Sequence, residues 1–509
     1  MKSKEIEKVT LGGKLTIEEF VAVARYKAKV EFSEEYKNRV VRSRKIIEKC
    51  VEEQKVVYGT TTGFGALVTQ NISKDQAEIL QRNIIITHST SVGEPFSEEV
   101  VRAIMLMVLQ SLGMGVSGVR LELLEQYREF LNKNLTPYVP KEGSVGYLCA
   151  EAHTASVLLG EGKAYYEGKL YDSRTALEKA GMKPFTLSYK EGLALTNGVT
   201  SPAAMAALAV YDMRKAIESA DIIAALSFEG LHGLLKAYDD QVLACRPFKE
   251  IRETAHKIKD ILKDSQVVKA AEGSHVQDSL SLRCIPQLHG AVKKTVDDAW
   301  RAVEIEINGC GDNPIVVGTE DEFDVFSNGN PDSAYMGLEM DSVCIAAGAA
   351  AKMSERRNAR FLDDKLSGYP SFLVKNPGLN SGLMIPQYTQ AGLMNDMKIL
   401  AHPASVDSIT TSANQEDYVA MGYNACKKAL QCVEKLEYIL AIELFSAYQA
   451  QQFIDEKLER GQGSRKVLAY LKERIPVMEE DMYIYPNLEA LKTEIHEGGI
   501  IDCLAEKDQ

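Results

Sequence analysis

Residues 203–226 read AAMAALAVYDMRKAIESADIIAAL, a stretch rich in small and apolar residues that contains neither proline nor glycine. Alanine and leucine are among the strongest helix formers. A helix that is apolar around most of its circumference belongs in a core rather than on a surface. The stretch therefore predicts a long, buried helix.

Four further stretches have the same helical character, namely 292–307, 341–367, 388–398 and 416–454. Strand signals are few and short, as at 314–317 and 324–326. Because apolar helices of this length need neighbours to cover them, we expect a mainly α protein with a long central helix bundle. Along the chain we expect a loop-rich N-terminal part over residues 1–200, the bundle over 201–475 and a more polar C-terminal extension over 476–509.

The composition is that of a globular protein, with 45% hydrophobic and 26% charged residues among 509. A net charge of −13 argues against a nucleic-acid partner, because phosphate binding needs a basic surface. No uninterrupted apolar run approaches the roughly 18 residues of a membrane span, and residues 1–9 lack the apolar core of an export signal. The nine cysteines form no C-x-x-C pair. We therefore expect a cytoplasmic protein with reduced thiols, no membrane partner and no metal site.

Several motifs follow one another along the chain: Y-G-T-T-T-G-F-G at 58–65, Q-R-N at 81–83, G-S-V-G at 143–146, L-T-N-G at 195–198, Q-D-S-L-S-L-R-C at 277–284, D-N-P at 312–314 and S-A-N-Q-E-D at 412–417. In this order they resemble the aromatic amino acid ammonia-lyase family, and most of all its histidine ammonia-lyases, over roughly residues 14–472. The resemblance implies the fold of that family, a small-molecule substrate and a homotetramer in which each active site is drawn from three subunits.

Tyr58 opens a glycine-rich loop that can close over a substrate. A free phenol has a pKa of about 10, so it needs nearby cations to act as a base near neutral pH. The resemblance gives Tyr58 the role of removing a proton from the β-carbon of the substrate. The alternative, a tyrosine packed against a turn, is disfavoured because the whole eight-residue motif is present.

Arg283 is the candidate clamp for a substrate carboxylate, because a guanidinium can form two parallel hydrogen bonds to that group. The alternative is a surface or helix-pairing arginine, which the surrounding motif disfavours. By resemblance, Asn197 and Gln277 would supply neutral donors and acceptors around the same carboxylate. Asn313 would do likewise, although D-N-P is also an ordinary turn sequence.

Glu416 and His88 are the candidates for binding the substrate ring. A buried carboxylate can accept an N–H from an imidazole, and leaving it unpaired costs about 1–3 kcal/mol. Thr87-His88 resembles the corresponding pair in histidine-acting members of the family. The two positions therefore predict a substrate with an imidazole-type side chain, the alternative for His88 being a satisfied histidine at a helix end.

The chain departs from the family pattern at the reaction centre. G-S-V-G is followed directly by Y-L-C-A-E-A-H, whereas the family has A-S-G and then D-L-A-P-L-A-H. In the family, the A-S-G cyclises into an electrophilic methylidene-imidazolone group. Tyr147 takes the place of the aspartate, Leu280 that of a catalytic tyrosine, and Pro331-Asp332 that of phenylalanine-histidine. We therefore expect no methylidene-imidazolone and no other cofactor.

A substrate that needs no such electrophile carries a quaternary ammonium group. Its nitrogen has no lone pair to add to the electrophile, and it leaves as a neutral amine. We therefore predict β-elimination of trimethylamine from ergothioneine to give thiourocanate, the reaction of the ergothionases in this family. Asp332 would lie near the trimethylammonium, and Tyr147 would offer it an aromatic face.

Two alternatives stay open. The first is a histidine ammonia-lyase, which converts histidine to urocanate and ammonia, with a cyclised Ala-Ser-Gly unit that the printed sequence does not show. The second is an inactive homologue that binds an imidazole ligand. Retention of Tyr58, Arg283 and Glu416 speaks against the second.

Overall fold

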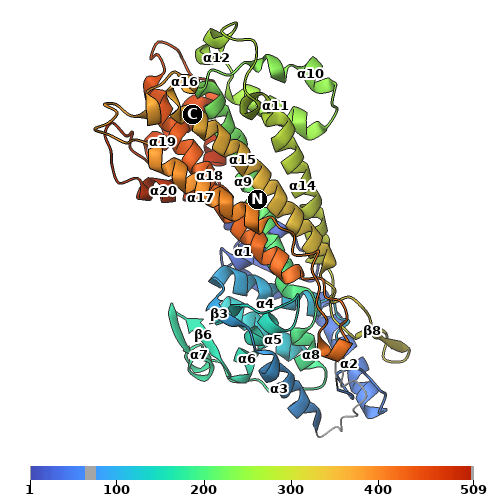
Figure 1. Cartoon of the computed structure of the whole chain (residues 1–509). Coiled ribbons are helices and arrows are strands. Elements are labelled where there is room, and N and C mark those ends of the chain that lie inside the picture. The colour runs from blue at the N-terminus through green and yellow to red at the C-terminus, as the bar shows by residue number, and fades with distance from the viewer. Residues whose placement is uncertain (1, 64–75, 506–509) are drawn as a thin grey trace. The chain divides into compact units, whose positions relative to one another are not determined.

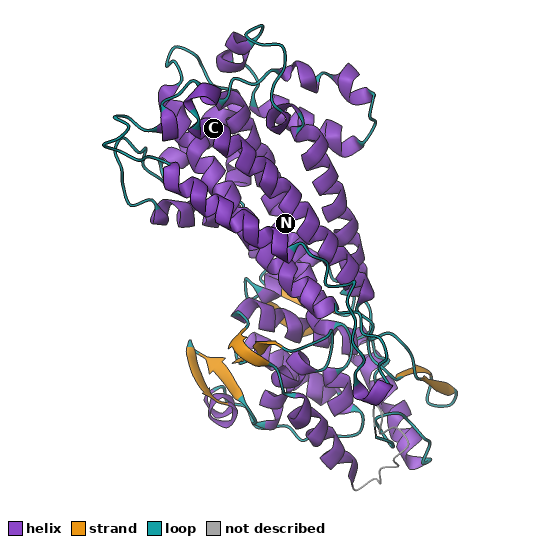
Figure 2. Ribbon diagram, viewed as in Figure 1, coloured by secondary structure: helices purple, strands orange, loops and turns teal. Residues whose placement is uncertain are grey.

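The computed structural model describes residues 2–63 and 76–505 (Figure 1). Helices dominate and the strands are short (Figure 2), so the prediction of a mainly α protein with long helices is confirmed. Two residues of the glycine-rich loop at 58–65, Phe64 and Gly65, lie outside the described residues. Contacts divide the chain into a first unit, Met1–Tyr211, Trp300–Asp341 and Pro403–Lys427, and a second unit, Asp212–Ala299, Ser342–His402 and Lys428–Gln509.

The first unit contains helices of up to 19 residues and four small sheets. Its helices are α1 (Ile17–Ala24), α2 (Glu34–Glu52), α3 (Ala77–His88), α4 (Glu98–Leu112), α5 (Leu121–Asn132), α6 (Cys149–Ser156), α7 (Ser173–Lys179) and α8 (Glu191–Thr196). Its strands are β1 (Lys8–Leu11), β2 (Lys29–Phe32), β3 (Val92–Pro95), β4 (Thr136–Pro137), β5 (Pro140–Glu142), β6 (Lys163–Tyr166), β7 (Lys169–Asp172), β8 (Ile315–Gly318) and β9 (Phe323–Phe326). β1 pairs with β2 in parallel, while the pairs β3–β5, β4–β6, β6–β7 and β8–β9 are antiparallel.

Helix α4 forms the centre of the first unit, because nearly all of its residues are buried. It includes Arg102, whose guanidinium is fully buried. That group donates to the carbonyls of Val23, on α1, at 2.9 Å and of Leu131, on α5, at 3.0 Å. A buried guanidinium is tolerated where its donors are satisfied. Arg102 therefore joins three helices of this unit.

The long helices are α9 (Thr200–Gly230), α14 (Ile285–Glu306), α15 (Ala334–Leu362), α17 (Met384–Leu400) and α18 (Gly422–Ala450). The second unit also contains α10 (Asp240–Ala244), α11 (Lys249–Ile261), α12 (Gln266–Ala271), α13 (Leu280–Arg283), α16 (Asp364–Ser367), α19 (Gln462–Lys472), α20 (Tyr485–Glu497) and α21 (Gly499–Ala505). The segment Glu191–Gly230 is apolar and long enough to cross a membrane, but 94% of its most apolar window is buried inside the protein. The helix is therefore apolar because it lies in the core, and the prediction of a long, buried helix over 203–226 is confirmed.

Buried polar contacts join the long helices within the second unit. Glu443 on α18 accepts hydrogen bonds from Ser227 on α9 at 2.7 Å and from Arg357 on α15 at 2.5 Å. Gln390 on α17 accepts from Asn358 on α15 at 2.8 Å and donates to the carbonyl of Ile439 on α18 at 3.0 Å. These contacts fix the register of the bundle, since each buried polar group must meet its partner.

The predicted helices are all observed, but several of their ends differ. The helices predicted over 292–307 and 341–367 begin seven residues earlier, at Ile285 and Ala334, and the helix predicted over 416–454 begins later, at Gly422. The preceding residues cannot extend it, because Ser412, Ala413, Asn414 and Met421 all have positive φ. Glu416 therefore lies in a loop. The predicted division at about residues 200 and 475 stays a prediction.

Candidate active site

Tyr58 is held at the start of its loop by a buried glutamine. Gln81, on α3, is fully buried. Its side-chain nitrogen donates to the Gly59 carbonyl at 3.2 Å, and its oxygen accepts from the Gly192 and Leu193 amides of α8 at 2.8 and 3.2 Å. Gly59 has φ +61°, and a Cβ there would approach a methyl carbon of Leu193 to 2.3 Å. The loop therefore packs closely on α8. This contact fixes the position of Tyr58, which directly precedes Gly59.

The loop that precedes α6 places Tyr147. The Ser144 hydroxyl accepts from the Gly146 amide at 3.3 Å and donates to the Tyr147 carbonyl at 3.1 Å. The Leu148 amide donates to the carbonyl of Thr196, the last residue of α8, at 3.0 Å. Leu148 adopts φ +77° immediately before α6 begins. These contacts anchor the loop to the same helix that supports Tyr58.

Tyr147 and Glu416 form a hydrogen-bonded pair. The Tyr147 hydroxyl donates to Oε2 of Glu416 at 3.1 Å, and the Thr411 hydroxyl donates to the same oxygen at 2.9 Å. Burial raises the pKa of Tyr147 well above the ordinary value of a phenol, and nearby Glu416, Asp332 and Tyr58 raise it further. The hydroxyl therefore stays protonated at neutral pH, and Tyr58, Asp332 and Glu416 all lie within electrostatic reach of it.

His88 ends α3 in the same neighbourhood. Burial lowers the pKa of His88, and the nearby Glu416 carboxylate opposes that shift. Its Nδ1 lies 3.2 Å from the Thr87 hydroxyl. At neutral pH the imidazole is therefore uncharged and can donate or accept a hydrogen bond. The structure thus brings together His88, Tyr147, Glu416 and Tyr58, four of the residues predicted from the sequence.

Asn197 and Asn313 lie around a buried carboxylate. The Asn197 side-chain nitrogen donates to the Asn313 carbonyl at 2.8 Å and to Oδ1 of Asp312 at 3.3 Å. Asn313 donates its amide to Asp312 at 2.8 Å, and its side-chain oxygen accepts from the Asn328 amide at 3.0 Å. The Asn313 side-chain oxygen therefore holds a neighbouring loop.

Sequence reasoning missed Lys190, the partner of Asp312. Its ammonium lies 2.7 and 2.9 Å from the two carboxylate oxygens, and both side chains are fully buried. The only signal was a charged pair, Lys190-Glu191, directly before the apolar run of α8. That pattern is equally typical of an exposed helix start.

Asp332 has a local structural role. Its Oδ1 accepts from the Ala334 amide at 2.7 Å, at the beginning of α15. A short acidic side chain at this position satisfies an amide that the helix leaves without a partner. A hydrogen bond to Asp332 also raises the pKa of Tyr418. Asp332 is thus near Tyr147, and part of its carboxylate is committed to α15.

Gln277 and Arg283 belong to the second unit, where both line a cavity of about 740 Å³. Arg283, at the end of α13, donates to the Asp278 carbonyl at 2.6 Å. Among the described residues, this is the only hydrogen bond of its guanidinium, so most of the fork can still bind a ligand. Leu280, which replaces the family tyrosine, begins the same helix and is 62% exposed.

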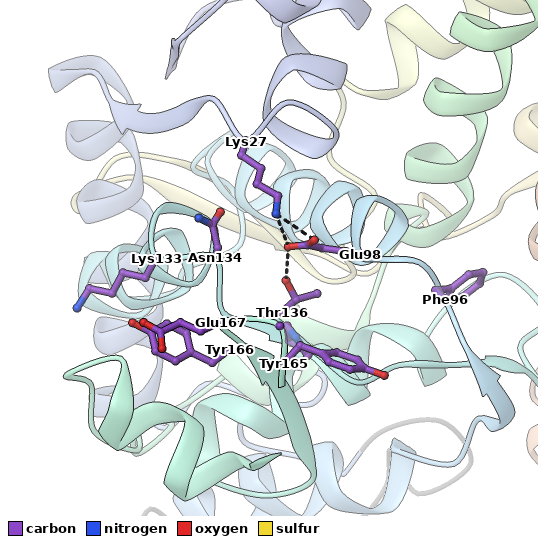
Figure 3. Close-up of a pocket in the computed structure, with 11 residues that line it drawn as sticks. Lys27, Phe96, Glu98, Lys133, Asn134, Thr136, Tyr165, Tyr166 and Glu167 are labelled. Carbon is purple, nitrogen blue, oxygen red and sulfur yellow. Dashed lines mark hydrogen bonds and ion pairs between the residues drawn. The ribbon is translucent and has the colours of Figure 1, made fainter. Parts of the chain in front are cut away.

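A second cavity, of about 640 Å³, lies in the first unit and is shown in Figure 3. None of the predicted site residues lines it. Lys27 pairs with Glu98 at 3.0 Å, and Lys133 donates to the Ala180 carbonyl at 2.8 Å. Both lysines at this cavity are therefore committed to protein groups. Over residues 2–63 and 76–505, no cluster of His, Cys, Asp and Glu could hold a metal ion.

Comparison with known proteins identifies the family. Residues 15–473 match the model of the family described as aromatic amino acid lyase. The chain is 42% identical to the histidine ammonia-lyase of Caldanaerobacter subterraneus, over 97% of this chain and 98% of that one. Its structure resembles histidine ammonia-lyase from Trypanosoma cruzi with a TM-score of 0.91 and 34% identity, over 98% and 95% of the two chains. It resembles ergothionase from Treponema denticola with a TM-score of 0.89 and 27% identity, over 97% and 100%.

These relatives correct the prediction of trimethylamine elimination from ergothioneine. Eight curated relatives that are 40–43% identical are histidine ammonia-lyases, whereas the ergothionase is 27% identical. The prediction relied on four departures at the reaction centre. Similarity along the whole chain outweighs those few positions, so the main prediction was wrong.

The prediction that the protein uses no prosthetic group is also contradicted, because histidine ammonia-lyases of this family use a methylidene-imidazolone formed from Ala-Ser-Gly. The sequence of this chain has no Ala-Ser-Gly in the loop that would have to form the group. Gly146 is followed by Tyr147, and the loop's one serine, Ser144, lies between Gly143 and Val145 and is hydrogen-bonded within the loop. On the family match and the similarity of the whole chain, the protein belongs to the aromatic amino acid lyase family and is a carbon–nitrogen lyase.

Proposed function

We propose that the protein is a histidine ammonia-lyase that converts histidine to urocanate and ammonia. The observation that carries the proposal is the hydrogen bond between Tyr147 and Glu416, with His88 within electrostatic reach of Glu416 and Tyr58 within electrostatic reach of Tyr147. The names of the curated relatives support the same substrate. A reaction on histidine needs a group that binds an imidazole and a base that reaches the neighbouring carbon.

Glu416 would bind the imidazole ring. Its Oε2 is held by Tyr147 and Thr411, and among the described residues Oε1 accepts no hydrogen bond. The ring N–H of histidine would donate to that oxygen, forming a charge-assisted hydrogen bond. Neutral His88 would contact the ring without adding a charge that repels it.

Tyr58 would act as the base. As a phenolate it would take a proton from the β-carbon of histidine, the electrons of that C–H bond would form the double bond of urocanate, and the C–N bond would break to release ammonia. The Arg283 guanidinium would hold the substrate carboxylate with Gln277 nearby. The proposal includes a cytoplasmic homotetramer, in which subunits combine these residues with Tyr58 and Glu416.

The activity is tested by incubating the purified protein with histidine and following urocanate by its ultraviolet absorbance together with released ammonia. We expect both products in equal amounts, and we expect Tyr58→Phe to fold normally and lose turnover. Release of trimethylamine from ergothioneine without urocanate from histidine would overturn the proposal, as would normal turnover by Tyr58→Phe.

The prosthetic group has its own test. Since relatives that deaminate histidine use methylidene-imidazolone, the proposal holds only if the mature chain carries a cyclised unit after Gly146 that the printed sequence does not show. The printed residues have a mass of 56.2 kDa. We expect the intact protein to be heavier by the mass of one cyclised Ala-Ser-Gly. A mass equal to that of the printed residues would contradict histidine deamination.

A further inference from the structure

A fully buried ion pair lies against the side chain of Asn197. The Lys190 ammonium contacts both carboxylate oxygens of Asp312, at 2.7 and 2.9 Å, and neither side chain is exposed to solvent. Lys190 adopts φ +70° directly before α8, which ends at Asn197. Neither charge of such a pair can be removed alone without leaving the other buried and uncompensated.

The hydrogen bonds of Asn197 determine which way its amide faces. An ionised carboxylate and a backbone carbonyl only accept hydrogen bonds. The Asn197 side chain contacts one of each, Oδ1 of Asp312 at 3.3 Å and the Asn313 carbonyl at 2.8 Å. Its NH₂ group must therefore face both, and this uses its two hydrogens. The atom left for a ligand is Oδ1, which accepts no hydrogen bond from any described residue.

We propose that Lys190 is a positioning residue that holds the Asp312 carboxylate in place as an acceptor, so that Asn197 presents only its amide oxygen to the substrate. That oxygen would accept a hydrogen bond from the substrate ammonium and could not donate one to the carboxylate. The assignment rests on the proposed function, because it takes the ligand to be a histidine-type zwitterion. It replaces the prediction that Asn197 helps to hold the carboxylate.

The orientation of Asn197 is tested by calorimetry with two ligands, histidine and 3-(imidazol-4-yl)propionate, which has the ring and carboxylate but no amine. The measurement uses a Tyr58→Phe background, so that histidine is not consumed. For Asn197→Leu we expect histidine affinity to fall about tenfold or more, as for a lost hydrogen bond to a charged group, with little change for the propionate. Equal losses for both ligands, or a loss confined to the propionate, would overturn the assignment.

The role of Lys190 is tested with the double variant Lys190→Met/Asp312→Asn. Removing both charges avoids an unpaired buried ion, so the variant should melt close to the parent protein. Residue 312 is then an amide that can donate as well as accept, so the Asn313 carbonyl is the one group that still requires the NH₂ of Asn197, and the amide is held less firmly in its orientation. We expect the preference for histidine over the propionate to fall about tenfold, since that preference depends on one hydrogen bond. A folded double variant with the parent preference would exclude the role of Lys190.

Arg120→Met is the matched control. Arg120 pairs with Glu191, a fully buried carboxylate in the first turn of α8, at 2.6 Å. The substitution removes the ion pair of a buried carboxylate at the opposite end of α8 and leaves Arg44 4.0 Å from Glu191, and no hydrogen bond among the described residues joins Glu191 to Asn197. We expect a lower melting temperature and an unchanged ligand preference; a changed preference would show that any damage to α8 suffices.

Binding and turnover separate the two proposals. If the protein binds histidine without forming urocanate, the proposed function is wrong. The comparison of the two ligands still tests the orientation of the Asn197 amide. The Asn197→Leu result does not depend on whether the double variant folds.

Discussion

The phenol of Tyr147 donates a hydrogen bond to Oε2 of Glu416 across 3.1 Å, although the two residues are 269 positions apart in the sequence. The hydroxyl of Thr411 donates to the same oxygen. One oxygen of the carboxylate is thus committed to protein donors and the other is left for a ligand. Because burial and the carboxylate raise the pKa of Tyr147, this phenol is a donor at neutral pH and leaves Tyr58 as the candidate base.

Replacing Tyr147 by Phe should lower kcat/KM for histidine about tenfold, since a hydrogen bond to a charged group contributes about 1.5–3 kcal/mol. The ring is retained, so the melting temperature should change little. Steady-state kinetics and a thermal melt measure the two effects. Tyr418→Phe is the control, because Tyr418 bonds to Asp332 instead of Glu416. Equal losses in both variants would show that Glu416 does not depend on Tyr147.

Gln81→Leu should weaken both folding and catalysis. The substitution removes hydrogen bonds to the Gly59 carbonyl and to the Gly192 and Leu193 amides, and leaving such buried groups unpaired costs about 1–3 kcal/mol. Denaturant unfolding measures that loss, and kcat should fall because the loop of Tyr58 loses its anchor.

The neighbouring residue supplies the control for Gln81. Arg82 pairs with Glu161 at 2.8 Å, and its side chain is 53% exposed. An exposed ion pair contributes about 0–1 kcal/mol, so Arg82→Leu should have little effect on unfolding or kcat. Comparable losses in the two variants would mean that general damage to α3 explains the result.

The long helices could be predicted from the sequence because their signal is local. The helix predicted over 388–398 is observed as Met384–Leu400, since composition and periodicity within the segment suffice to identify it. The start of α18 was misplaced by six residues, Glu416 against Gly422. The residues before it are compatible with a helix by composition, but they adopt left-handed conformations in the folded loop.

The candidate site was predictable only where a motif marks the residue. Tyr58, His88 and Glu416 lie in recognisable motifs, and in the structure Tyr147 binds Glu416 with Tyr58 within its electrostatic reach, while His88 is within that of Glu416. Lys190 has no such mark, because its importance comes from Asp312, which lies 122 positions away. The orientation of Asn197 could not be predicted either, since it follows from that ion pair. Pairings of this kind are properties of the tertiary structure.

Arg283→Lys should raise KM for histidine with a smaller change in kcat. A lysine ammonium cannot reproduce the two parallel hydrogen bonds of a guanidinium to a carboxylate, and it loses the contact to the Asp278 carbonyl. Lys236→Gln is the control, because it removes another cation that lines the same cavity. An equal rise in KM for both variants would indicate general electrostatic attraction in place of a clamp.

Glu151 should make the stability of the protein depend on pH. The residue is fully buried, and it stands where the family pattern has a leucine. Its Oε1 accepts from the Thr200 hydroxyl at 2.9 Å and the Ser201 amide at 2.8 Å, at the beginning of α9. Among the described residues, Oε2 has no hydrogen-bond partner. Burial raises the pKa of Glu151 above its ordinary value of 4.5.

A raised pKa in the folded state means that the folded protein holds this proton more tightly than the unfolded chain does. At low pH both states are protonated and folding carries no penalty. As the pH rises above about 4.5, the unfolded chain ionises first, and the folded state loses stability until the pH passes the folded pKa.

Glu151→Gln keeps an acceptor for Thr200 and Ser201 but cannot ionise, so it should be increasingly more stable than the parent as the pH rises. Urea unfolding of both proteins across this range measures the difference. A difference that is constant with pH, or that grows toward acid, would contradict the raised pKa. Glu129→Gln removes the carboxylate of a partly exposed ion pair with Arg128 and should show no comparable trend.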